Sequence, residues 1–208
     1  MDVLPTQKIL YFSPLLSSMK IKPEIRILGI DDGSLVDDKV LVVGVVFRGG
    51  FWIDGVLSTY IERDGLDATD KIIEMVKNTR HKDLGVIMFD GVTLGGFNTI
   101  DIKKINEETE LPCIIVIRRM PDMLSIKNAL KYLKDPEKRE KMIENAGKVY
   151  KIELKDNKVL YYQFYGLKKE EAEKIIKITA IHSSLPEPVR VAHIIATGVV
   201  RGEASRKP

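Results

Sequence analysis

Apolar positions along this chain follow two periodicities, one typical of strands and the other of helices. Three early runs are rich in β-branched and aromatic side chains, and turn signals separate them. We expect these runs to be strands at residues 24–31, 39–47 and 51–60. The Arg48-Gly49-Gly50 break predicts a hairpin, so the third strand returns antiparallel to the second. Ahead of them, residues 1–23 contain three prolines, which predicts an irregular lead-in.

The period of the pattern changes near Asp67. From there, apolar residues recur at helical spacing, with Ile72, Ile73 and Val76 on one face. Strands and helices then alternate: a strand at 84–89, a helix around 99–108, a strand at 112–117 and a helix at 123–134. The order is therefore β-β-β-α-β-α-β-α. Three antiparallel strands that lead into βαβ units predict a mixed α/β sheet with helices on both faces.

The remainder of the chain predicts an α-β-β-α-α extension. A helix at 136–146 precedes a hairpin of strands at 149–154 and 159–164, and two helices follow. The stretches 175–181 and 189–199 hold too many apolar side chains for exposed helices, so we expect both to pack against the sheet. We expect one domain over residues 1–208, with its core at about 24–134 and the extension at about 135–201; the polar end after 201 is expected to fray.

Composition narrows the class of protein. Hydrophobic residues make up 44% of the chain and charged residues 30%, as in ordinary globular proteins, and the net charge of +3 permits nucleic-acid binding without requiring it. The single cysteine, Cys113, excludes a disulfide framework and a cysteine-rich zinc site, and its apolar surroundings indicate a core residue. No apolar stretch approaches the roughly 20 residues that span a bilayer. The N-terminus lacks a signal-peptide pattern, so we expect a cytoplasmic protein.

Two of the predicted buried strands end in aspartate followed by glycine. Asp31 closes the first strand, and Asp90 follows the strand at 84–89. Buried strands rarely end this way unless the carboxylate caps a turn or binds a cation, and both readings are open for each strand taken alone. The element order favours the cation. It is the ribonuclease H-like arrangement, in which these two strands lie side by side and bring the carboxylates within about 6 Å, close enough to share metal ions.

The first helix offers a third carboxylate. Asp67 and Asp70 lie three residues apart and share a helical face. Asp67 has a competing role as the N-cap, with Asp70 three residues later in a capping-box-like arrangement. Clustered carboxylates repel one another unless a cation neutralises them, and oxygen-only ligands favour Mg²⁺ or Mn²⁺ over zinc.

These motifs carry a family resemblance. The segments Gly29-Ile30-Asp31, Phe89-Asp90-Gly91, the Asp67/Asp70 region, residues 112–119 and residues 190–194 together resemble endonuclease V, and more closely its archaeal relatives called endonuclease dU. The resemblance implies a metal-dependent endonuclease that acts on deaminated or damaged nucleic acid, DNA or RNA, with one or two Mg or Mn ions. It also implies that Asp31, Asp90 and Asp70 are the catalytic metal ligands.

Several other residues are candidates for the same site. Arg118 and Arg119 end the strand at 112–117, where endonuclease V carries a basic residue near the scissile phosphate; each could clamp phosphate or simply be a solvated charge. Gly95 and Gly96 could allow close approach of the backbone to a ligand. His193 lies on an apolar helical stretch, which suits either a core histidine or an acid/base or metal-facing residue.

Asp32 should point to the side opposite Asp31 if the strand continues, which suits a turn or a supporting role near the ligands.

The chain also departs from endonuclease V at two places. It reads Ser-Thr-Tyr-Ile-Glu at 58–62, where endonuclease V has a Pro-Tyr-x-Pro-like wedge, and it has no His-Pro-Arg element at 92–97. Both elements shape the pocket for the deaminated base. Two alternatives therefore stay open: a non-catalytic nucleic-acid-binding module of the same fold, and a nucleotide phosphohydrolase. Against the phosphohydrolase, this chain has no glycine-rich phosphate loop followed by Lys and Ser or Thr.

Overall fold

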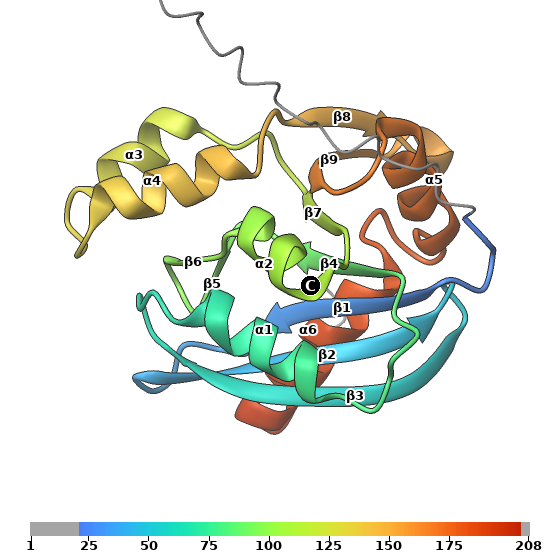
Figure 1. Cartoon of the computed structure of the whole chain (residues 1–208), viewed down its shortest axis with the longest axis horizontal. Helices are drawn as coiled ribbons and strands as arrows, with labels where there is room; N and C mark the ends of the chain where they lie inside the picture. The colour runs from blue at the N-terminus through green and yellow to red at the C-terminus, as the bar shows by residue number, and fades with distance from the viewer. Residues whose placement is uncertain (1–20, 205–208) are drawn as a thin grey trace, which may run out of the picture.

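The computed structural model describes residues 21–204 and contains a seven-stranded mixed sheet with helices on both faces (Figure 1). The order of its strands is β3-β2-β1-β4-β7-β9-β8. The five strands of the predicted core are β1 (Arg26–Asp32), β2 (Lys39–Arg48), β3 (Trp52–Glu62), β4 (Val86–Asp90) and β7 (Cys113–Ile117). The first three are antiparallel, whereas β1, β4 and β7 run parallel. This is the predicted ribonuclease H-like sheet. Most of the predicted lead-in at 1–23 lies outside the described residues.

Strand β1 lies inside the sheet, between β2 and β4, and its side chains are buried on both faces. Leu28 and Ile30 point toward helix α1 (Ala68–Asn78) and helix α2 (Ile102–Thr109), whereas Ile27 belongs to the core on the other face. Gly29 allows helix α6 (Glu187–Arg201) to cross close over the strand, because a Cβ there would lie 2.2 Å from the carbonyl carbon of Pro188.

The last two helices cover the face of the sheet opposite α1 and α2. Helix α5 (Lys169–Thr179) buries Ile175 and Ile176 completely, and α6 packs on β1 and β2 through Ala192 and Ala196 (Figure 1). The prediction that both final helices pack against the sheet is therefore confirmed. No helix within residues 21–204 is long and apolar enough to cross a membrane.

The C-terminal hairpin extends the main sheet, because β9 (Val159–Tyr165) pairs antiparallel with β7, and β8 (Tyr150–Glu153) pairs with β9 across a short 3-10 turn at Lys155–Asn157. Helices α3 (Met123–Leu130) and α4 (Pro136–Asn145) project together beyond the strands (Figure 1). Helix α3 ends at Leu130, four residues before the predicted end at 134. A further hairpin of β5 (Thr93–Leu94) and β6 (Asn98–Thr99) was not predicted, because two-residue strands leave no periodic pattern.

Candidate active site

The carboxyl ends of β1 and β4 bring two aspartates to one edge of the sheet. In the parallel register Ile30 pairs with Phe89, so Asp31 and Asp90 follow paired residues on neighbouring strands. Both strands are fully buried up to that point, which fixes the backbone that carries each carboxylate. The predicted adjacency of the two strands is confirmed.

Asp31 is a buried carboxyl group with two partners. Its Oδ2 lies 2.8 Å from Nδ1 of His193, and its Oδ1 accepts a hydrogen bond of 2.9 Å from the backbone N–H of Asp32. Burial raises the pKa of Asp31 to about 7, the hydrogen bond with His193 opposes that rise, and the charges of Asp90 and Asp32 add to it. A carboxyl held this way gains from any neighbouring positive charge.

His193 reaches this site from α6, 162 residues further along the chain. The hydrogen bond with Asp31 raises the pKa of His193, and partial burial opposes that rise. Its side chain is 30% exposed, so the ring contacts both the protein and the solvent. The ring of His193 thus meets a buried aspartate on one side and solvent on the other, and an acid/base role for it stays a prediction.

Asp90 is paired with Arg118, which directly follows β7. The guanidinium Nη2 of Arg118 donates to Oδ2 of Asp90 at 2.8 Å, and the side chain of Asp90 is only 17% exposed. Because β7 runs parallel to β4, its end delivers Arg118 to the same edge of the sheet as the two aspartates. Arg119 is exposed beside it.

Asp32 lies close to this group of charges, but its carboxylate extends to the other face of the sheet, toward the β5–β6 hairpin, as expected. Burial raises the pKa of Asp32; a hydrogen bond from the backbone N–H of Gly95, at 3.0 Å to Oδ2, opposes this, while the charge of Asp90 adds to it. Its carboxyl also interacts directly with that of Asp31. Consecutive side chains of β1 therefore still alternate at its end: Asp31 meets His193 of α6, and Asp32 meets the β5–β6 hairpin.

Gly95 and Gly96 form the turn of the small β5–β6 hairpin. Both have positive φ angles, +55° and +87°, which glycine adopts without strain. A Cβ on Gly96 would also lie 2.4 Å from Oδ1 of Asp64. The turn thus anchors Asp32 through the Gly95 N–H, and a contact of either glycine with substrate stays a prediction.

Asp70 does not join Asp31 and Asp90. It lies on the first turn of α1 with its side chain 68% exposed, and it pairs with Lys104 of α2 at 2.6 Å. The capping-box-like arrangement predicted for Asp67 and Asp70 was also wrong. Asp67 occupies the N-cap position, but its carboxylate makes no capping hydrogen bond and instead accepts hydrogen bonds from Asn98 at 2.6 Å and from the backbone N–H of Glu62. Both aspartates therefore have local structural partners.

The donor set at the edge of the sheet suits a hard divalent cation. Within residues 21–204, no group of three or more His, Cys, Asp or Glu side chains is arranged to hold a metal ion. Mg²⁺, however, commonly uses one or two carboxylates and completes its coordination with water and substrate phosphate. Asp31 and Asp90 provide two such carboxylates. Burial is the main cause of the raised pKa of Asp31, and a cation would offset both this burial and the repulsion from Asp90 that adds to it.

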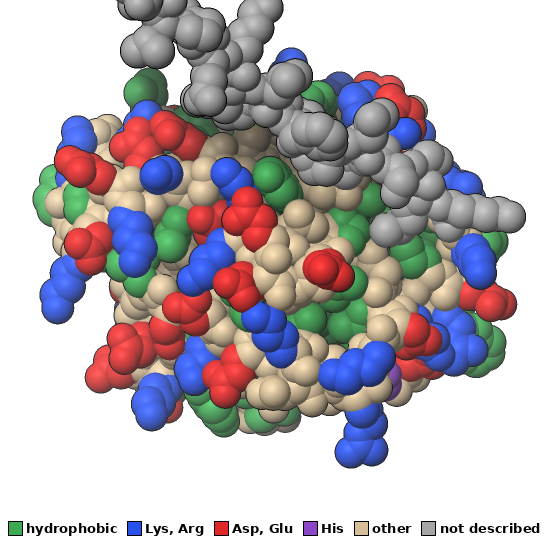
Figure 2. Space-filling view, in the orientation of Figure 1, with side chains coloured by type: hydrophobic (Ala, Val, Ile, Leu, Met, Phe, Trp, Pro, Cys, Tyr) green, Lys and Arg blue, Asp and Glu red, His purple; other side chains and the backbone are tan. Residues whose placement is uncertain are grey.

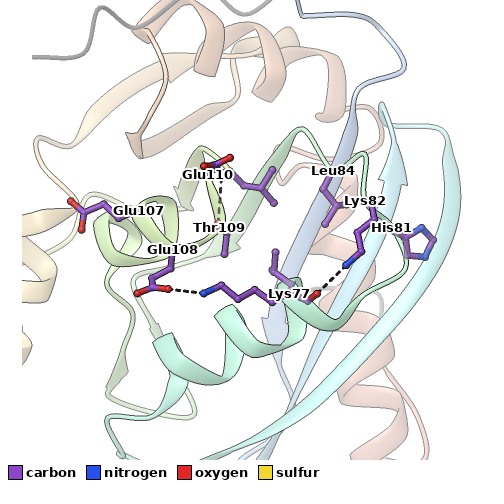
Figure 3. A pocket seen from close by; sticks show the side chains of 10 residues that line it. Lys77, His81, Lys82, Leu84, Glu107, Glu108, Thr109 and Glu110 are labelled. Atoms are coloured by element: carbon purple, nitrogen blue, oxygen red, sulfur yellow. Dashed lines mark hydrogen bonds and ion pairs between the residues drawn. The ribbon is translucent and has the colours of Figure 1, made fainter.

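A separate hollow of about 370 Å³ lies at the opposite end of β4, between α1 and α2 (Figure 3). Three of its charged side chains already have partners: Lys77 pairs with Glu108 at 2.6 Å, and Lys82 donates to the carbonyl of Lys77 at 3.0 Å (Figure 3). The walls offer no unpaired buried polar atom to a ligand. We therefore locate the chemistry at the aspartate edge and not in this hollow.

Comparisons with known proteins find similarity to one family over most of the chain. The model of a family described as endonuclease dU matches residues 23–200. A UPF0215 protein of Methanosarcina mazei is 52% identical over 193 residues, which cover 92% of this chain and 98% of that protein. A crystal structure of a protein of unknown function from Archaeoglobus fulgidus has a TM-score of 0.78 and 42% identity over 86% of this chain and 99% of its own.

More distant structures show a likeness of fold alone. Endonuclease V of Ciona intestinalis, solved in complex with a 24-mer DNA that contains an inosine followed by a ribo-adenosine, has a TM-score of 0.55 and 13% identity. The match covers 81% of this chain and 82% of that one. This fold carries the same central strands that place Asp31 and Asp90 here.

Proposed function

The chain belongs to the endonuclease dU family, and from this premise we propose that it is a metal-dependent endonuclease acting on deaminated or otherwise damaged nucleic acid. One observation carries the proposal: the buried Asp31–His193 pair lies beside the Asp90–Arg118 pair at the ends of adjacent parallel strands. Acid, base and cation at one edge of a sheet are the groups that hydrolysis of a phosphodiester requires.

His193 is the group that moves a proton. Asp31 holds its Nδ1, which fixes the orientation of the ring and leaves Nε2 as the nitrogen that can exchange a proton with a reacting group. The same hydrogen bond stabilises the imidazolium, since it raises the pKa of His193. In this role His193 accepts a proton from the attacking water or gives one to the departing oxygen.

Arg118 is the group that meets the substrate phosphate. Its guanidinium has five N–H donors, and the contact with Asp90 uses one of its nitrogens, so further donors remain for phosphate oxygens. Arg119, exposed next to it, adds a second positive charge on the approach. Substrate phosphate would compete with Asp90 for Arg118, which frees the Asp90 carboxylate.

Asp31 and Asp90 would hold the Mg²⁺ or Mn²⁺ ion, with Asp32 in support through its contact with Asp31. When bound, the ion supplies Lewis-acid activation of water and neutralises negative charge on the phosphate. The DNA in the Ciona intestinalis complex supports nucleic acid as the substrate of this fold, but both DNA and RNA fit the arrangement here.

The proposal is tested by incubating the protein with Mg²⁺ or Mn²⁺ and end-labelled oligonucleotides, DNA and RNA, that carry uracil, hypoxanthine or xanthine. We expect cleavage that EDTA abolishes and that is lost in Asp31→Asn. Asp70→Asn is the matched control, because it removes an identical carboxylate outside the site. Tight binding without cleavage of any oligonucleotide would refute the endonuclease and favour the non-catalytic binding module, in which Arg118 keeps Asp90 permanently occupied.

A further inference from the structure

An apolar ridge stands beside the candidate active site, on the segment that leaves the sheet after Arg118. Its members are Met120, Met123 and Leu124, which are 60%, 38% and 75% exposed. We refer to these three side chains as the α3 ridge. A single exposed apolar side chain is common on protein surfaces. Several large apolar side chains exposed close together more often mark a binding surface.

The ridge is held in a defined position relative to the site. Met120 is two residues from Arg118, whose guanidinium contacts Asp90 at 2.8 Å. Asp122 caps helix α3 by accepting hydrogen bonds from the backbone N–H groups of Leu124 and Ser125, at 3.1 Å and 3.2 Å. The capped first turn therefore holds Met123 and Leu124 on a fixed backbone.

The charge around the ridge favours a polyanion as its partner. The face shown in Figure 2 mixes acidic and basic side chains, so charge does not mark that face as a whole as a binding surface. The segment 118–134 differs locally, with five Lys or Arg residues and the single acid Asp122, which the cap uses. Lys127 is paired with Glu140 of α4; Arg118 and Arg119 directly precede the ridge, and Lys131 and Lys134 follow the other end of α3. Apolar side chains framed by bases suit the stacked bases and phosphates of a nucleic acid.

We infer that the α3 ridge inserts into the base stack of a duplex beside the scissile phosphate and unstacks the nucleotide presented to the site. This inference rests on the proposed function. Met, Leu and similar apolar side chains are the ones that proteins wedge between base steps, at the expense of stacking energy. Enzymes that act on a single base need that base outside the stack of the duplex. In single-stranded nucleic acid the base is already accessible, so no wedge is needed.

The test compares the double variant Met123→Ser/Leu124→Ser with the wild type on duplex and single-stranded substrates of one sequence. The control is Val56→Ser, which removes a side chain 51% exposed on the edge strand β3, away from the site. We expect the double variant to cleave the duplex about tenfold more slowly, a barrier change of ~1.4 kcal/mol, and the single strand at the wild-type rate.

A second measurement separates the ridge from the chemistry. A duplex with 2-aminopurine next to uracil is titrated with each protein in EDTA, where the fluorescence of the analogue rises when its stacking is broken. We expect a rise with the wild type and with Val56→Ser, and none with the double variant at saturating protein.

Equal fluorescence for the double variant and the wild type, or an equal loss of cleavage on duplex and single strand, would overturn the wedge while leaving the endonuclease intact. A wild type that fails to raise the fluorescence at saturation also overturns it. A fluorescence rise that needs the ridge, in a protein that cleaves nothing, would refute the endonuclease and support the wedge.

Discussion

Arg139 is the most informative position for stability, because it is a buried cation with carbonyl oxygens as its partners. Only 2% of the residue is exposed. Its guanidinium donates to the carbonyls of Lys134, Gly65, Phe97 and Asp64, at 2.8, 2.8, 2.6 and 2.7 Å. One side chain thereby joins the α3–α4 connection to the β3–α1 loop and to the β5–β6 hairpin.

Replacing Arg139 by Met keeps much of the buried volume and removes all four hydrogen bonds. At ~1 kcal/mol net each, these bonds are worth ~4 kcal/mol. Burial lowers the pKa of Arg139, which shows that desolvation opposes the charged form, so removing the charge returns part of that sum. We expect a net loss of about 3 kcal/mol in the free energy of unfolding, or roughly 6–12 °C in Tm for a chain of this size.

Urea unfolding of Arg139→Met against the wild type measures this loss. The control is Arg63→Met: Arg63 is 48% exposed in the side chain and meets Asp64 only at 3.8 Å, so its free energy of unfolding should change by less than about 0.5 kcal/mol. Hydrogen exchange should also quicken at the amide of Phe97, which donates to Asp64 at 2.8 Å. If Arg139→Met unfolds at the wild-type urea concentration, the carbonyl contacts contribute no net stability and the reasoning fails.

Three further substitutions test the site and its support. Asp90→Asn should abolish divalent-dependent cleavage and leave folding intact or more stable without metal, since one source of repulsion disappears; full cleavage would show that Asp90 is the wrong residue. Asp70→Asn should keep cleavage and change stability by less than about 1 kcal/mol in urea unfolding, because its pair with Lys104 is exposed; loss of cleavage would return Asp70 to the site. Gly29→Ala should destabilise the protein by about 1–3 kcal/mol in the same assay, because its Cβ would meet the backbone of Pro188; an unchanged midpoint would contradict this close approach.

The strands were predictable because their signal is local. A run of buried apolar residues such as Ile27–Ile30 identifies β1 whatever surrounds it, and the order of elements then suggested which strands are neighbours. The pairing of β9 with β7 was not predictable in the same way, since it joins residues about fifty positions apart by backbone hydrogen bonds that any sequence can make. The hairpin was therefore expected as part of an extension, and it instead completes the sheet.

The positions of Asp31 and Asp90 followed from the strands that carry them, whereas the expected position of Asp70 on helix α1 was wrong. Helical spacing shows that Asp67 and Asp70 share a face, but not which way that face points. Helix α1 buries Thr69, Ile72, Ile73 and neighbouring apolar residues, and this turns Asp70 outward to Lys104. Asp32 was placed correctly, because alternation holds to the end of β1, where its carboxylate accepts a hydrogen bond from Gly95 on the face opposite His193.

The contact between Asp31 and His193 shows why the final helix belongs to the core and to the site at once. Ala192 and Ala196 are completely buried against β2, and His193 lies directly after the first of them. The same docking requires glycine at position 29, since α6 passes over β1 at Pro188. A buried aspartate two residues further along β1 would be a liability without a partner, and α6 supplies that partner only when it is docked. The helix that packs on β1 and β2 therefore also places His193 against Asp31.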